Sequence, residues 1–103
     1  MYRVTIIYNR PTDTAAFDEY YQNKHLPLVA KIPNLTRFAA GKCEALDANP
    51  PAAYALAQLY FDSKDQAGAA FASTEGQAAA ADVGNFASGG VKMLFSDEET
   101  TLP

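Results

Sequence analysis

The first strand expected in this sequence carries apolar side chains on both of its faces. Tyr2–Tyr8 is dense in β-branched and aromatic residues, a composition typical of a β-strand. Because successive side chains of a strand alternate, Val4 and Ile6 would point to one side of the sheet and Ile7 to the other. Both sides of a sheet built on this strand must therefore be covered, and this requirement constrains the fold more than any other feature.

The remaining periodic segments follow in the order strand, helix, strand, strand, helix, strand. This order is typical of the ferredoxin-like split βαββαβ arrangement, in which helices cover one face of a four-stranded antiparallel sheet. We therefore predict one α+β domain over residues 1–103. The elements are expected at Tyr2–Tyr8, Ala15–Lys24, Leu35–Leu46, Ala53–Phe61, Lys64–Ala72 continued by Glu75–Asp82, and Val91–Ser96.

A second copy of the chain is the expected cover for the other face of the sheet. A domain of 103 residues has a thin core, and a large exposed apolar sheet face is unusual for a monomer. A twofold-related copy, packed sheet against sheet, would remove that face from water. We predict a homodimer, and with it a dimeric α/β barrel.

Local signals mark the ends of the helices. Pro27 has no amide hydrogen to offer the carbonyl of Asn23, so the first helix should kink or restart near His25, with a short second piece over Leu28–Lys31. Asp13 or Thr14 is the expected N-cap of that first helix, and two capping boxes, Ser63 with Gln66 and Thr74 with Gln77, predict where the later helices begin.

His25 is the only histidine and the first candidate for catalysis. An imidazole changes charge near neutral pH, which suits a general acid or base. The alternative is a helix-terminal histidine that bonds local carbonyls and complements the helix dipole. On a helical wheel His25 lies at the border of the stripe formed by Phe17 and Tyr21.

Five further side chains are candidates to bind a ligand. Tyr8 and Tyr21 carry hydroxyls that need partners if buried, although an aromatic core would also explain them. Arg37 would bind a carboxylate or an enolate, or else pair with an acidic residue at the surface. Gln58 shares a strand face with Tyr60, and a polar residue on a central strand indicates a pocket. We expect Tyr8 and Tyr60 to orient a ligand between helices and sheet.

The composition excludes several classes of function. The formal net charge is −4 and the eight Lys and Arg residues are scattered, which excludes a nucleic-acid surface. One His and one Cys cannot form a closed zinc site, and the glycines match no phosphate-binding pattern, so we expect no metal and no cofactor. No apolar run approaches the ~20 residues that cross a membrane. The single Cys43 and the absence of a visible signal peptide favour the cytoplasm.

The first helix and the turn after it contain a distinctive set of residues: Phe17, the pair Tyr20-Tyr21, His25 four residues later, Pro27-Leu28 and the turn at Pro33. With these residues the chain resembles the EthD family, whose members are similar to a protein encoded beside genes for ethyl tert-butyl ether degradation. This resemblance implies a dimeric α/β barrel, a fold shared with cofactor-free monooxygenases, muconolactone isomerases and stress-response proteins.

Three functions remain open at this point. The first is an EthD-like, cofactor-independent enzyme of the isomerase, lyase or monooxygenase type that acts on small oxygenated organic compounds, with His25 moving a proton. The second is a non-catalytic dimeric module that binds a small molecule or supports an oxygenase pathway. The third is a structural dimer. The first requires a pocket with His25 at its wall, whereas the third requires a solid aromatic stripe with His25 bonded only to backbone.

Overall fold

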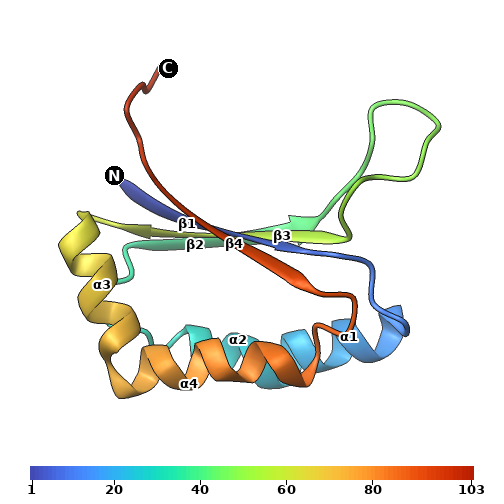
Figure 1. Cartoon of the computed structure of the whole chain (residues 1–103), viewed down its shortest axis with the longest axis horizontal. Coiled ribbons are helices and arrows are strands. Elements are labelled where there is room, and N and C mark those ends of the chain that lie inside the picture. The colour runs from blue at the N-terminus through green and yellow to red at the C-terminus, as the bar shows by residue number, and fades with distance from the viewer.

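The computed structural model describes residues 1–103 and has two layers, a four-stranded antiparallel sheet and a layer of helices on one of its faces (Figure 1). The strands are β1 (Tyr2–Tyr8), β2 (Arg37–Lys42), β3 (Ala55–Phe61) and β4 (Val91–Asp97). They lie in the order β2-β3-β1-β4. This is the predicted ferredoxin-like α+β fold.

The helical layer has two halves, one from each βαβ unit. None of its helices has the length and the apolar character needed to span a membrane. The first half is α1 (Thr14–Tyr20), the π-helical turn η1 (Tyr21–His25) and α2 (Leu26–Val29). The second half is α3 (Lys64–Ala72), α4 (Thr74–Asp82) and the 3₁₀ turn η2 (Val83–Asn85).

The expected break near His25 takes the form of a widened helical turn. The Leu26 amide donates to the carbonyl of Tyr21, five residues back instead of four. The widened turn lies directly before Pro27, which lacks the amide hydrogen of a regular helix. α2 begins at Leu26 and not at Leu28 as expected, because proline is tolerated in the first turn of a new helix.

The helix caps agree with the sequence except at α4. Asp13 caps α1, where its side chain accepts a hydrogen bond from a backbone amide at 3.0 Å. Ser63 caps α3 in the same way, at 3.1 Å. α4 is capped by Ser73 and not by Thr74, because Ser73 Oγ accepts the Gly76 amide at 3.0 Å. The chain therefore turns directly from α3 into α4, one residue earlier than expected.

The two middle strands are shorter than expected. β2 begins at Arg37, after Asn34 turns the chain in the left-handed region with φ of 63°. β2 ends at Lys42 and β3 starts only at Ala55, since β2 is an edge strand and the chain between them leaves the sheet as a loop (Figure 1).

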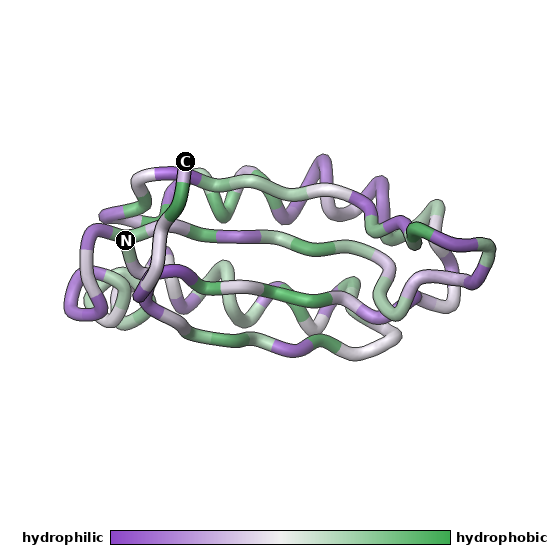
Figure 2. Tube along the Cα trace, turned by 90° about the horizontal axis from the view of Figure 1, so that it is seen from above, coloured by the Kyte–Doolittle hydropathy of each residue, from purple (hydrophilic) through white to green (hydrophobic).

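The core lies between the sheet and the helices, and the other face of the sheet is left open by the helices. The largest fully buried side chains come from the two central strands: Val4, Tyr8, Leu59 and Phe61. Figure 2 views the sheet from the side opposite the helices and shows hydrophobic and hydrophilic residues mixed along the strands. The apolar residues of this open face include Ile7, Leu56 and Leu94, of which Leu94 is 52% exposed.

Candidate functional site

His25 is buried, with 3% of its surface exposed, at the end of the π-helical turn η1. Its imidazole lies 4.6 Å from the Phe86 ring and 5.5 Å from that of Tyr21, measured between ring centroids. The sequence placed His25 at the border of the aromatic stripe. The widened turn instead places it inside the core, where a polar side chain needs a partner.

That partner is Asp82, at the end of α4. Nδ1 of His25 and Oδ2 of Asp82 are 3.0 Å apart in a buried contact. Burial would raise the pKa of Asp82, but the hydrogen bonds from Tyr20, Asn85 and His25 outweigh it and hold the pKa below its usual range. Because the carboxylate is ionised and can only accept, Nδ1 carries the proton and Nε2 is left as the basic nitrogen.

The other carboxylate oxygen of Asp82 is held by two further donors. The Tyr20 hydroxyl donates to Oδ1 at 2.6 Å and the Asn85 side-chain amide donates at 2.9 Å. With three donors from three segments of the chain, the carboxylate has one fixed orientation. His25 is therefore bonded to a positioned side chain and not to backbone carbonyls alone, which argues against the structural-dimer interpretation.

Tyr8 brings a second polar group to the same place. Its ring is 1% exposed and meets the rings of Phe17 and Tyr21 edge-on, and its hydroxyl is fully buried without a hydrogen-bond partner. Burial, followed by the nearby Tyr21 and Asp82, raises the pKa of Tyr8 well above its usual range. Tyr8 therefore stays protonated and offers an O–H donor.

A small cavity adjoins both groups. It measures about 20 Å³, lies between the sheet and the helices, and is lined by Tyr8, Tyr21 and His25 together with apolar residues of the core. A space of this size holds about one water molecule. The enzyme hypothesis requires a pocket with His25 at its wall; this cavity has His25 in its lining but is smaller than an organic substrate.

A larger groove of about 250 Å³ lies beside the cavity, where α1 and η1 meet the ends of β2 and β3. Asp18 lines this groove. Its carboxylate accepts a hydrogen bond from Lys42 Nζ at 2.9 Å and another from the Tyr54 hydroxyl at 2.8 Å. Asp18 is part of a partly exposed polar cluster that joins α1 to the end of β2, which no local pattern indicates.

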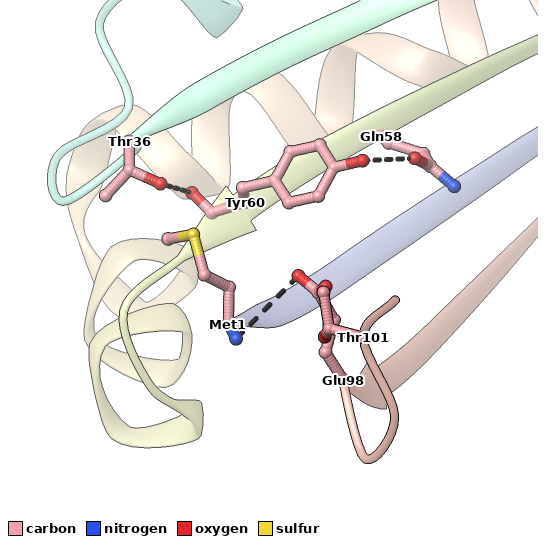
Figure 3. Close-up of polar contacts among 6 residues, drawn as sticks. All are labelled: Met1, Thr36, Gln58, Tyr60, Glu98 and Thr101. Carbon is pink, nitrogen blue, oxygen red and sulfur yellow. Dashed lines mark hydrogen bonds and ion pairs between the residues drawn. The ribbon is translucent and has the colours of Figure 1, made fainter. Parts of the chain in front are cut away.

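The other three predicted ligand residues form a separate cluster on the open face of the sheet. The Tyr60 hydroxyl donates to Gln58 Oε1 at 2.6 Å (Figure 3), and the Arg37 guanidinium lies 5.4 Å from the Tyr60 ring centroid. Tyr60 pairs with Arg3 of β1, and Arg3 and Tyr8 lie on opposite faces of β1. The expectation that Tyr8 and Tyr60 share one pocket is therefore wrong, and Gln58 has its polar partner within its own strand.

Asp82 and Asn85 are the site residues that sequence reasoning missed. Asp82 lies 57 positions from His25, so no local spacing links them. One signal was present: a carboxylate at the C-terminal end of a helix is unfavourable to the helix dipole, which indicates that a specific partner holds it there.

Comparisons with known proteins agree with this fold. The family model described as the EthD domain matches residues 9–90. The chain is 74% identical, over the full length of both chains, to a Rhodococcus erythropolis protein described as an uncharacterized 11.0 kDa protein in the thcB-thcC intergenic region. An EthD family protein from Bacillus halodurans has a similar structure, with a TM-score of 0.89 at 28% identity over 95% of this chain and 98% of that one. A dimeric ferredoxin-like protein of unknown function from Thermobifida fusca matches with a TM-score of 0.66 at 21% identity, over 92% and 88% of the two chains.

Proposed function

Because this chain belongs to the EthD family, we propose that it binds a small oxygenated organic compound between its helices and its sheet, and that it acts there as a cofactor-independent enzyme with His25 as general acid and base. The observation that carries this proposal is the buried contact of 3.0 Å between His25 Nδ1 and Asp82. A carboxylate at one imidazole nitrogen fixes the tautomer and leaves the other nitrogen to take a proton.

The two polar groups at the cavity suit one elementary step. Nε2 of His25 removes a proton from a hydroxyl, or from a carbon beside a carbonyl, and the electron pair moves onto the ligand oxygen. The Tyr8 hydroxyl donates a hydrogen bond to that oxygen, which stabilises the negative charge. Asp82 stabilises the imidazolium that forms. Proton removal of this kind can begin reactions of the isomerase, lyase and cofactor-free monooxygenase types, so the proposal covers these reactions.

A second function is favoured by the size of the cavity. A cavity of about 20 Å³ holds no organic substrate, which favours a non-catalytic accessory protein of an oxygenase pathway, or a ligand-binding protein that binds its compound outside this cavity. The two functions differ in whether a bound compound is converted.

We also propose that the protein is a homodimer with the open sheet faces packed together. The apolar residues Ile7, Leu56 and Leu94 lie on that face, and the similar Thermobifida fusca protein is described as dimeric. Packing against a second copy would remove these side chains from water.

The test of the enzymatic function is a ligand screen followed by a turnover assay. Ring lactones, quinols and tertiary-alkyl compounds are screened for a rise in melting temperature, since a ligand that binds only the native state raises it. Compounds that bind are then assayed for conversion by wild type and by His25→Asn, whose side-chain amide still donates to Asp82 but which lacks Nε2. We expect turnover to fall about 10²–10⁴-fold in the variant, with binding retained. Binding without conversion by wild type would favour the accessory function.

A further inference from the structure

Two spaces of very different size meet at one side chain. The open groove of about 250 Å³ and the buried cavity of about 20 Å³ are separate, yet Tyr21 lines both of them. The groove approaches the size of a small-molecule site, which begins at about 300 Å³, but it does not contain His25 or Tyr8. The cavity contains both groups but has no room for a ligand. Neither space is a complete binding site alone.

The Tyr21 ring stands between the groove and the two polar groups. It stacks on Phe17 at 5.8 Å on the groove side, and its ring centroid lies 5.9 Å from that of Tyr8 and 5.5 Å from that of His25 on the cavity side. A rotation of this one side chain away from the core would therefore join the groove to the cavity.

Contacts with four neighbouring rings, and no hydrogen bond, hold Tyr21 in place. The hydroxyls of Tyr20, Tyr54 and Tyr60 each donate a hydrogen bond to a side chain, whereas that of Tyr21 makes none within the chain. Its ring is retained by aromatic contacts worth about 0.5–1.5 kcal/mol each. It also stands on the π-helical turn, a feature frequent at functional sites.

The linings of the two spaces define the ligand chemistry. Six of the ten residues around the groove are hydrophobic, among them Phe17, Tyr21 and Leu26. Its charged residues, Asp18 and Lys42, already bond to one another. The inner end offers the Tyr8 hydroxyl, which is buried without a partner, next to His25. A matching ligand is apolar along its body and carries a hydroxyl or a carbonyl at one end.

We propose that the groove and the cavity are two compartments of one ligand site, with Tyr21 as the movable wall that controls access to His25, and that the site takes a largely apolar compound bearing one oxygen at its inner end. This inference rests on the roles proposed above for His25 and Tyr8.

A second residue provides a matched control. Phe71 also lines the cavity, and it borders another outer hollow, beside α3. Its ring contacts Phe61 and Phe95 and not Tyr8 or His25, so it lies at the far end of the cavity. If ligands reached His25 from that end, Phe71 rather than Tyr21 would control access.

The test uses the single histidine as its own reporter. Diethyl pyrocarbonate modifies the free imidazole nitrogen, and mass spectrometry of the peptide carrying His25 gives the rate. Because Tyr21→Ala loses the aromatic contacts of the ring, we expect His25 to be modified about tenfold faster or more in this variant. We expect little change in the modification rate in Tyr21→Phe and in Phe71→Ala. Urea unfolding gives the stability of each variant, and from it the part of the modification rate that comes from the globally unfolded protein. A larger rise in Phe71→Ala than in Tyr21→Ala, or equal rates in all variants, would overturn the proposed wall.

The ligand class is tested in the same assay. We expect 1-naphthol to protect His25 from modification in Tyr21→Ala, and naphthalene at equal concentration to protect it less, with the difference lost in the double variant that also carries Tyr8→Phe. No protection by 1-naphthol, or equal protection by both compounds, would overturn the assignment. These assays do not depend on turnover. They can therefore contradict the two-compartment site without contradicting the acid–base role of His25, and a turnover assay can contradict that role without contradicting the site.

Discussion

His25 and Asp82 are separated by 57 positions in the chain, yet their side chains meet at 3.0 Å inside the core. The contact joins the two halves of the helical layer, since His25 ends η1 and Asp82 ends α4. It therefore has two consequences. It sets which imidazole nitrogen carries the hydrogen that faces Asp82, and it ties together helices that come from different βαβ units.

Asp82→Asn tests both consequences. The amide cannot accept from His25, Tyr20 and Asn85 as the carboxylate does, and one buried donor is left unpaired. We expect a loss of about 1–3 kcal/mol in the free energy of unfolding, measured with urea, and a fall in any turnover. Glu99→Gln removes the same charge from the exposed C-terminal segment and should change the stability by less than about 0.5 kcal/mol. Equal stabilities of the two variants would contradict a structural role of the contact.

The lowered pKa of Asp82 also predicts a dependence of stability on pH. A carboxyl group with a folded-state pKa below its unfolded value of about 3.9 contributes stability that is present above that value and is lost as the pH falls through the folded pKa. The difference in unfolding free energy between wild type and Asp82→Asn should therefore shrink below about pH 4. Asp18 has a lowered pKa as well, so the comparison with the variant, rather than the acid unfolding of wild type, isolates Asp82. A difference that stays constant down to pH 2.5 would contradict this assignment.

Tyr8→Phe removes the hydroxyl that has no partner. Since an unpaired buried hydroxyl is unfavourable, we expect the variant to be as stable as wild type or more stable by about 1 kcal/mol, while ligand binding and turnover fall. Tyr20→Phe is the matched control, because it removes a hydroxyl that donates to Asp82 and should lower the stability. Melting temperatures and ligand-induced shifts of the two variants check this. A marked destabilisation of Tyr8→Phe would show that its hydroxyl has a structural partner.

The sequence predicted those parts of the fold that depend on local signals. β1 and α3 have the expected bounds, because β-branched residues and the Ser63 cap act within a few positions. The break near His25 followed from Pro27 alone. The widened turn that buries His25 was not predicted, since it depends on packing against Phe86 and Asp82 from the other half of the layer.

The site was predicted only in part, for a related reason. The alternation along β3 correctly separated Gln58 and Tyr60 from Leu59, but it did not say which of these faces matches that of Tyr8. That information lies in the register between β1 and β3, in which Tyr60 pairs with Arg3. The contacts of Asp82 and Asp18 likewise depend on the tertiary structure.

Gly76 and Gly68 provide a contrast within the second half of the helical layer. A Cβ at Gly76 would lie 1.9 Å from the carbonyl oxygen of Ala70, because α4 starts directly against the end of α3. Gly76→Ala should therefore lower stability by more than about 2 kcal/mol, since backbone must shift. At Gly68 nothing lies within 4 Å of the added atom, so Gly68→Ala should raise stability by about 0.5–1 kcal/mol. Thermal unfolding of both variants measures the contrast, and the same sign for both would contradict the close approach of α3 and α4.

The proposed dimer is tested on the open sheet face. Leu94 lies on this face and is 52% exposed in the single chain, so a charge there costs a folded monomer little but would be buried in a sheet-to-sheet dimer. We expect wild type to have twice the 11.1 kDa chain mass by light scattering at micromolar concentration, and Leu94→Glu to be a folded monomer. Ala78→Glu places the same charge on the exposed side of α4, away from the sheet, and should remain dimeric. A wild-type monomer, or a Leu94→Glu dimer as stable as wild type, would show that a second copy does not cover this face.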